Sequence, residues 1–158
     1  MPETFALYRT LTSLPLGKQA FSFLFAQKAP YFWTVRPQVR EVRPHHAALV
    51  IRKRRAVQNH IGTVHAIAVC NGLEAAMGLL AEATTPAGRR WIPKGMEVKY
   101  QAKALGTLKA VATPMLSIVS AADGYDLPVK VSVTDAAGTE VFHATIAMWV
   151  SPRPPRTG

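Results

Sequence analysis

QNHIGTVHAIAVCNGLEAAMGLL, from Gln58 to Leu80, is the stretch of sequence that decides the fold. From Ala66 onward it is apolar in nearly every direction around a helix, so it predicts no solvent-facing stripe. Such a helix must be wrapped by the rest of the protein. Its length is near that of a membrane span, but Asn71 and Glu74 interrupt it. We therefore expect a buried central helix.

Three residues do not fit an ordinary core helix. Gly72 and Gly78 each weaken an isolated helix by up to roughly 1 kcal/mol, which predicts that other backbone approaches closely there. Glu74 would cost several kcal/mol if it were buried without a partner. We expect Glu74 to face a cleft or a subunit seam, or to have a partner.

The whole chain has the size and composition of one domain, which we place over residues 1–158. It has 158 residues, 49% of them hydrophobic, and no signal-peptide pattern at its start, so we expect a cytoplasmic protein. The single cysteine, Cys70, is expected to be a small core residue. The net charge of +10 predicts an anionic partner, which the charge alone does not identify.

The part before the central helix contains two predicted helices and two predicted strands. They are Phe5–Thr12 and Leu16–Gln27, then an extended stretch over Phe32–Arg43 and a strong strand over Ala47–Arg54. Pro37 inside the extended stretch indicates an edge strand or a bulge. His45 and His46 lie in the turn between the strands, but no third ligand follows at a suitable spacing, so we predict no metal site.

After the central helix the pattern changes to alternating residues separated by turn sequences. Four strands are predicted, with alternation over residues 96–103, 107–112, 129–134 and 141–150. The fold class is α+β: a strongly curved antiparallel sheet wrapped around one long central helix. We expect N-terminal helices over 1–30, the core over 31–151 and a flexible tail over 152–158.

The segment that leads into the helix resembles a known family. Asn59-His60-Ile61-Gly62-Thr63-Val64-His65, followed nine residues after His65 by Glu74, is similar to the phenylacetate-degradation type of hotdog-fold acyl-CoA thioesterase. In that family an Asn, a Gly and a His-Gly-Gly precede the central helix, and an acidic residue lies inside it. The resemblance implies the hotdog fold, and it is nearest to a branch of unassigned function.

The resemblance also implies roles for individual residues. Glu74 would be the general base or nucleophile, and the amide of Ala66 would polarise the thioester carbonyl. Asn59 would position water or the carbonyl, or would be only a turn residue. His65 would orient the loop, or would be structural. The chain departs from the pattern because Ala66 and Ile67 replace both glycines of His-Gly-Gly.

The resemblance further implies the assembly and the ligand. Hotdog pockets lie between subunits, so a homodimer is expected, and dimers can pair into tetramers. No cofactor is expected apart from coenzyme A as part of the substrate, and no membrane partner. The phosphates of coenzyme A would be held by basic residues: Arg54, Arg55, Arg89, Arg90 and Lys94.

Other functions stay open. The lost glycines allow a non-catalytic protein that binds acyl-CoA or another acyl ligand. A hotdog dehydratase would use His60 or His65 with the acidic residue, but its proline-rich loop is missing. Nucleic-acid binding rests on charge alone, without a binding motif. The sequence does not reveal the acyl group.

Overall fold

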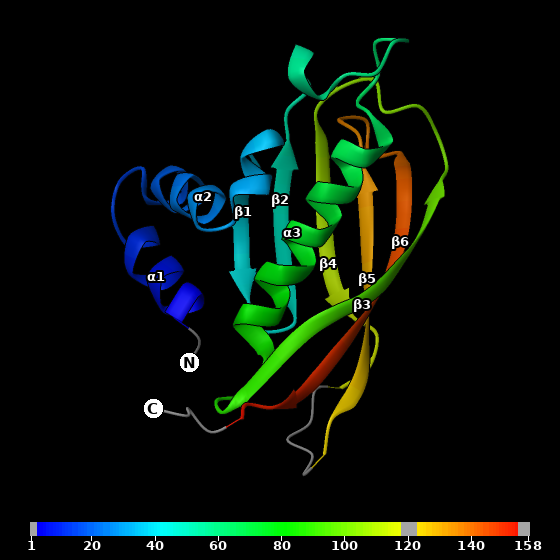
Figure 1. Ribbon diagram of the computed structural model, residues 1–158. Coiled ribbons are helices and arrows are strands. Elements are labelled where there is room, and N and C mark those ends of the chain that lie inside the picture. Colours follow the sequence, from blue (N-terminus) through cyan, green and yellow to red (C-terminus); the bar gives the residue numbers. More distant parts are fainter. Residues whose placement is uncertain (1–2, 118–122, 155–158) are drawn as a thin grey trace.

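The computed structural model describes residues 3–117 and 123–154 (Figure 1). Two helices and a 3₁₀ turn precede a hairpin, a long helix and four more strands. The elements are α1 (Glu3–Thr12), α2 (Gly17–Lys28), η1 (Pro30–Thr34), β1 (Gln38–Arg43), β2 (His46–Ile51), η2 (Arg55–Val57), α3 (Ala66–Thr84), β3 (Arg89–Tyr100), β4 (Leu108–Pro114), β5 (Tyr125–Thr134) and β6 (Glu140–Pro152). The predicted order of helices, two strands, central helix and four strands is confirmed.

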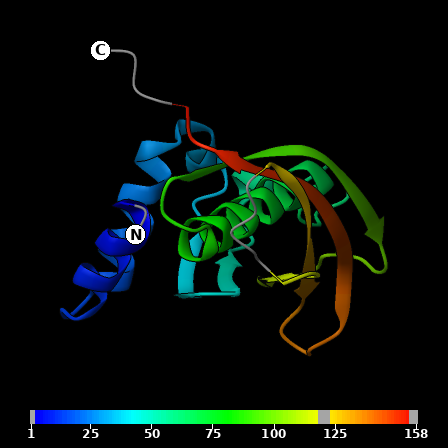
Figure 2. The same ribbon diagram turned by 90° about the horizontal axis from the view of Figure 1, so that it is seen from below.

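The six strands form one antiparallel sheet in the order β1-β2-β4-β5-β6-β3. The sheet curves around α3, which lies in its concave side (Figures 1 and 2). This is the hotdog fold that the sequence predicted. Both ends of the sheet order, β1 and β3, are edge strands.

The core lies between α3 and the concave face of the sheet. The predicted alternation holds on β5, where every second residue from Leu127 to Val133 is buried. It holds on β6 as well, where Ala144, Ile146 and Met148 are at most 1% exposed. Because successive side chains of a strand point to opposite faces, this pattern places one apolar face of β5 and of β6 against α3. The alternation predicted over residues 96–103 does not do the same for β3, which has no buried residue.

One side of α3 is not covered, which corrects the prediction of a helix wrapped all round. The side chain of Ile67 is 57% exposed, Glu74 is exposed, and Cys70 is half-buried. These residues share the side of the helix that faces away from the sheet. The helix is long and apolar enough for a membrane span, yet 67% of its most apolar window is buried inside the protein.

The two helix glycines face side chains, not the backbone that was predicted. A Cβ atom at Gly72 would lie 2.2 Å from Cδ1 of Ile51 on β2. A Cβ atom at Gly78 would lie 3.4 Å from the ring of Trp91 on β3. Gly72 is therefore needed for close packing, whereas Gly78 has room for a methyl group.

The N-terminal segment packs beside the β1 end of the sheet (Figure 1). The extended stretch predicted from Phe32 is wrong at its start, because residues 30–34 form the 3₁₀ turn η1 and the strand begins at Gln38. Proline at the start of η1 favours such a turn. The predicted edge strand is confirmed, with a bulge between Val39 and Glu41.

The last strand runs further than predicted. Pro152 was placed in the tail but belongs to β6, which pairs there with Arg89 of β3. The N–H of Arg153 then donates to the carbonyl of Gly88 at 2.8 Å. Proline is tolerated at this point because β6 ends there. The remaining tail residues, 155–158, lie outside the described residues.

Candidate functional site

The loop before α3 is closed by the side chain of Asn59. Its Oδ1 accepts hydrogen bonds from the N–H groups of Ile61 at 3.2 Å and Thr63 at 3.0 Å. Its Nδ2 donates to the hydroxyl of Thr63 at 2.8 Å. The amide is thus used inside its own loop, as in an Asx turn. Asn59 shapes the approach to α3, and a role in holding substrate would require these bonds to rearrange.

His65 is the N-cap of α3, and Ala66 is the first helical residue. Nδ1 of His65 accepts a hydrogen bond from the N–H of Ile67 at 3.1 Å. Among the described residues no acceptor satisfies the N–H of Ala66, which lies half-buried at the positive end of the helix dipole. The N-terminus of α3 therefore offers a free amide to an oxygen atom that carries negative charge.

Glu74 lies on the uncovered side of α3, at the middle of the helix. Its carboxylate is exposed, and within the described part of the chain it forms no ion pair and no side-chain hydrogen bond. Of the three alternatives predicted for Glu74, a partner inside the same protomer is therefore not found. One turn earlier, burial raises the pKa of the Cys70 thiol, so this cysteine is a poor nucleophile at neutral pH.

A small hollow of about 190 Å³ lies beside the start of α3 and contains a residue that the sequence reasoning did not select. Asn71 is 94% buried; its Nδ2 donates to the carbonyl of Tyr31 at 3.2 Å and to the hydroxyl of Thr34 at 3.3 Å. Its Oδ1 has no hydrogen-bond partner within residues 3–117 and 123–154. An amide inside an apolar helix, one turn before Glu74, was the available signal. His65 and Ile67 line the same hollow.

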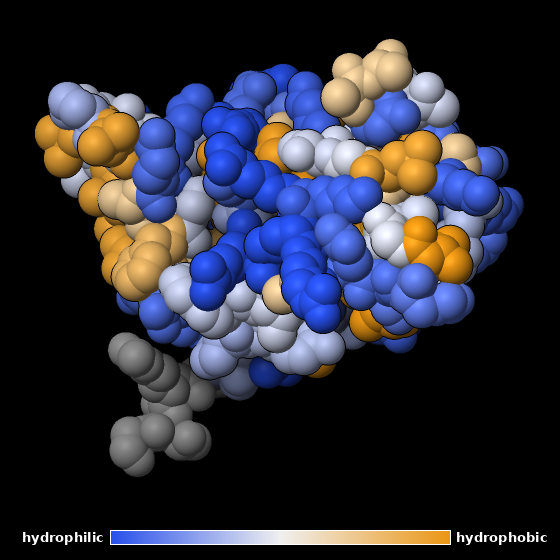
Figure 3. Space-filling view, turned by 90° about the horizontal axis from the view of Figure 1, so that it is seen from above, coloured by the Kyte–Doolittle hydropathy of each residue, from blue (hydrophilic) through white to orange (hydrophobic). Residues whose placement is uncertain are grey.

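Two of the predicted phosphate-binding residues lie at the N-terminal end of α3. Arg55 is exposed in η2, and the guanidinium of Arg54 donates to the carbonyl of Thr34. Burial, and secondarily the charge of Arg36, lower the pKa of Arg54. Figure 3 views this end of the molecule and shows strongly hydrophilic side chains across its middle. The surface around Arg54 and Arg55 can therefore bind an anion.

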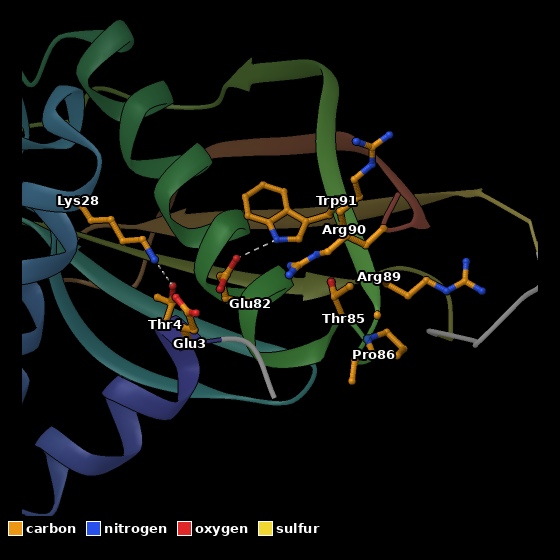
Figure 4. Close-up of a pocket in the computed structure, with 12 residues that line it drawn as sticks. Glu3, Thr4, Lys28, Glu82, Thr85, Pro86, Arg89, Arg90 and Trp91 are labelled. Atoms are coloured by element: carbon orange, nitrogen blue, oxygen red, sulfur yellow. Dashed lines mark hydrogen bonds between the residues drawn. The ribbon is translucent and has the colours of Figure 1, made fainter. Parts of the chain in front are cut away.

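Two others, Arg89 and Arg90, lie at the opposite end of α3, because β3 begins where the helix has ended. A helix of 19 residues separates the two pairs by about 28 Å. They border a hollow of about 670 Å³, to which Lys28 and Arg153 also contribute (Figure 4). Among the described residues none of these four cations forms an ion pair with a carboxylate.

The floor of this larger hollow is fixed by polar contacts. The indole N–H of Trp91 donates to Oε1 of Glu82 at 3.1 Å, and Lys28 donates to the hydroxyl of Thr4 at 3.2 Å (Figure 4). Thr85 is 5% exposed, and its hydroxyl has no partner in the part of the chain that the structure describes. The four cations outnumber the two carboxylates that line the hollow, those of Glu3 and Glu82, so the hollow has a net positive charge. It can accept an anion.

Lys94 does not belong to either group. Its Nζ forms an ion pair with Asp126 at 3.0 Å and lies over the ring of Trp149 at 5.1 Å. Lys94 is also the bulged residue between Pro93 and Gly95 on β3. The five predicted cations are therefore divided among three places in one protomer.

Comparison with known proteins places these features in a family. A family model described as a domain of unknown function, DUF4442, matches residues 17–150. The genomics protein APC5556 has a crystal structure that is 40% identical, covers 95% of this chain and 99% of its own, and gives a TM-score of 0.82. No curated protein matches the sequence significantly.

More distant solved structures share the fold. A Pseudomonas aeruginosa protein of unknown function, described as a probable thioesterase, is 18% identical over 89% of this chain and 97% of its own, with a TM-score of 0.75. A Streptococcus mutans protein bound to acetyl-CoA is 19% identical over 74% of this chain and 90% of its own, with a TM-score of 0.63. At these identities the likeness is one of fold.

Proposed function

The chain belongs to the DUF4442 family, and from this premise we propose that it is a cytoplasmic hydrolase of acyl-CoA thioesters. The observation that carries the proposal is the exposed carboxylate of Glu74, which pairs with none of the described residues and lies on the uncovered side of an otherwise apolar helix. A free amide at Ala66 opens the same helix. One protein with this fold is described as a probable thioesterase, and another is bound to acetyl-CoA; both support the reaction class.

The reaction needs a base and an oxyanion donor around one carbonyl. Glu74 takes a proton from a water molecule, whose oxygen attacks the thioester carbon. The carbonyl oxygen becomes an oxyanion and accepts a hydrogen bond from the N–H of Ala66 at the positive end of the helix dipole. The carbon–sulfur bond then breaks, and the thiolate of coenzyme A leaves and takes up a proton.

Glu74 and Ala66 of one protomer cannot serve the same carbonyl. They are eight residues apart on one helix, which is about 12 Å along its axis. The N–H of Ala66 must lie about 3 Å from the carbonyl oxygen, and the water that attacks the same carbonyl must lie about 3 Å from the Glu74 carboxylate. The proposal therefore requires Glu74 from one copy of the chain and Ala66 from another, as in a homodimer with a site at each end of the seam.

Strand β3 offers the surface for such a dimer. It is an edge strand, and it exposes Ile92 by 58%, Met96 by 36% and Tyr100 by 62%. An exposed apolar edge is a template for pairing with another strand. Two copies of β3 related by a two-fold axis would pair antiparallel and extend the sheet across both protomers.

The position of β3 along α3 fits this arrangement. Trp91 packs over Gly78, and the two elements run in opposite directions (Figure 1). From this contact, four residues forward along β3 and eight residues back along α3 both span about 12 to 13 Å. The middle of β3 is therefore level with Cys70. Because Ala66 and Glu74 lie four residues to either side of Cys70, a two-fold axis there brings Ala66 level with Glu74 of the other copy.

The same dimer would bring the separated cations together. Arg89 and Arg90 begin β3, and antiparallel pairing would place them beside the end of the other copy's β3. The loop that follows that end is bonded to the start of α3, since Val64 donates to the carbonyl of Ala104 at 2.9 Å. We assign Arg89 and Arg90, with Lys28 and Arg153, to the phosphates of coenzyme A. Lys94, paired with Asp126, stays outside this group.

Thiol release from a series of acyl-CoA thioesters tests the proposal. The wild-type protein should hydrolyse at least one chain length. Glu74→Ala should lower kcat by about 10²- to 10⁴-fold and leave KM nearly unchanged. Glu41→Ala, which also removes an exposed carboxylate, is the control and should keep full activity. Equal rates for Glu74→Ala and wild type would remove Glu74 from the mechanism.

A second function is favoured by one observation at the same place. Ile67, which stands where the related thioesterases have a glycine, is 57% exposed and lines the hollow beside the helix start. Its side chain narrows the approach to the Ala66 amide. A protein that binds acyl-CoA without hydrolysing it would result. Calorimetry would then show micromolar binding of a non-hydrolysable thioester analogue by a protein that turns over no acyl-CoA, and Ile67→Gly would increase turnover.

A further inference from the structure

Helix α2 is apolar on two opposite sides, and only one of them faces the protein. Phe21 and Phe25 are buried, 1% and 9% exposed. Phe23 and Leu24 are 52% and 42% exposed, and with Leu16, which immediately precedes the helix and is 74% exposed, they form an outward apolar stripe. The burial of Phe21 and Phe25 explains why α2 folds against the core. It does not explain the outward stripe.

The stripe is part of a wider surface, which we call the outer α2 face. The face comprises Leu7, Leu16, Phe23, Leu24, Tyr31 and Trp33. The rings of Phe23 and Trp33 are 5.5 Å apart and meet edge to face, and Leu7 and Leu24 line one hollow between α1 and α2. Figure 3 shows apolar side chains gathered over the α1 and α2 end of the molecule. Exposed apolar surfaces of this kind commonly mark interaction sites.

Cationic side chains border the outer α2 face on several sides. The guanidinium of Arg36 lies 4.6 Å from the centre of the Trp33 ring. Lys18, Arg40 and Arg52 share a hollow with Leu14 and Leu16, and none of the described residues that line it is a carboxylate. Lys28 lies beside Leu7 and Leu24, with Glu3 as the one acidic residue lining that hollow. The border of the face is thus strongly positive.

The backbone holds one apolar side chain outward at some cost. Leu16 has a φ of 59°, in the left-handed region that residues other than glycine rarely adopt. It lies in the turn between α1 and α2 and is 74% exposed. The carbonyl of Leu16 accepts hydrogen bonds from the N–H groups of Gln19 and Ala20, so this conformation starts α2, while the exposed side chain adds nothing to the core.

We propose that the outer α2 face docks the protein onto the surface of an anionic lipid bilayer. Leu16, Phe23 and Leu24 enter the boundary between head groups and acyl chains, and Trp33 and Tyr31 lie at the head-group level, where such rings are enriched. Lys18, Arg36, Arg40 and Arg52 on the border of the face meet the lipid phosphates. The net charge of +10 draws the protein to such a surface.

A second copy of the chain is a poorer occupant of the same face. In a two-fold contact each residue meets the same patch of its partner, so the cations around one face would lie against the cations around the other. Like charges brought together in this way oppose association. A bilayer that carries negative head groups satisfies both the apolar centre and the positive border.

Vesicle co-sedimentation tests the proposal with the full chain. The wild-type protein should bind vesicles of 30% phosphatidylglycerol in phosphatidylcholine, and binding to pure phosphatidylcholine should be at least tenfold weaker. Leu16→Glu combined with Phe23→Glu should lower binding to the anionic vesicles by at least tenfold. The matched control is Met115→Glu with Leu116→Glu, two residues that are 53% and 57% exposed at the end of β4. The control should bind like wild type.

Three results would overturn the proposal. The first is no binding of the wild type to anionic vesicles. The second is equal binding by the Leu16 and Phe23 variant, which would mean adsorption by net charge alone. The third is a lower oligomer mass of that variant in light scattering without a change in vesicle binding, which would assign the face to a second copy. Thermal unfolding identifies a misfolded variant. If the double variant is misfolded, vesicle binding by the single variant Leu16→Ser, at the most exposed position, tests the proposal in its place.

Discussion

Gly72 of α3 lies directly beneath Ile51 of β2, so close that a Cβ atom on Gly72 would be 2.2 Å from Cδ1 of Ile51. Ile51 is fully buried and has little room to move. We expect Gly72→Ala to destabilise the protein by about 1 to 3 kcal/mol, because overpacking outweighs the gain in helix propensity. Urea unfolding measures the change. A stability equal to or above that of wild type would show that the helix can shift away from β2.

Gly78, six residues further along the same helix, should respond in the opposite direction. A Cβ atom there would lie 3.4 Å from the Trp91 ring, at the edge of ordinary contact. Gly78→Ala should stabilise the protein by up to about 1 kcal/mol through helix propensity. The same urea titration compares the two variants. A loss as large as that of Gly72→Ala would mean that the Trp91 ring cannot adjust.

The contrast between the two glycines shows where sequence reasoning stops. Their presence in an apolar helix predicted close packing, but only the sheet register decides that Ile51 meets one of them and Trp91 the other. The same limit applies to charge: Lys28 and Arg153 are far apart in sequence, and the fold brings both to the hollow of Arg89 and Arg90. Long-range convergence of this kind has no local signal.

The sequence predicted strands and the central helix well because their patterns are local. Alternation on β5 and β6 follows directly from burying one face of the sheet. Sequence patterns could not separate residues that face the core from apolar residues that face a partner. In sequence, the exposed Ile67 of α3 and Phe23 of α2 therefore look like the buried apolar residues beside them.

His65 offers a way to separate a structural from a catalytic role. Its Nδ1 caps α3 by accepting from the N–H of Ile67. His65→Ala should cost about 1 kcal/mol of stability, and His65→Asn should keep most of it because asparagine is a strong N-cap. Thermal unfolding and thioester hydrolysis are measured on both variants. Full activity of His65→Asn would show that His65 acts only as the helix cap. A stable but inactive His65→Asn variant would show that the imidazole takes part in the reaction.

Glu140 gives a pH-dependent contribution on the outer face of the sheet. The hydrogen bond from the Ser132 hydroxyl and, to a smaller extent, His143 lower the pKa of Glu140 below its usual 4.5. A carboxylate whose pKa is lower in the folded state stabilises the protein above the unfolded pKa, and this stability is lost as pH falls through the folded value. Glu140→Gln should thus reduce stability by under about 1 kcal/mol at pH 7. Urea midpoints of the two proteins should converge as the pH falls from 4.5 through the lowered pKa of Glu140; a constant difference would contradict this origin.

The β3 seam predicts that two charges placed on it separate the protomers. Ile92→Glu combined with Tyr100→Glu alters two exposed side chains, so the fold should persist. Light scattering at about 10 μM should show a dimer for wild type and a monomer for the variant, whose hydrolysis should be lost in parallel. The pair Met115→Glu and Leu116→Glu serves as control. A monomeric wild type that retains full activity would contradict the seam.

The division of labour between two copies can be tested by mixing two inactive variants. Glu74→Ala removes the base, and Ala66→Pro removes the amide N–H at the first helical position, where proline is well tolerated. His65 already has the extended backbone, φ −62° and ψ 136°, that a following proline requires. In a mixed dimer one site carries both defects, and the other combines an intact Glu74 with an intact Ala66. After subunit exchange at equal amounts, half of the dimers are mixed and each has one whole site, so activity should return to about a quarter of wild type. If both groups acted within one protomer, every site in the mixture would stay defective and no activity would return.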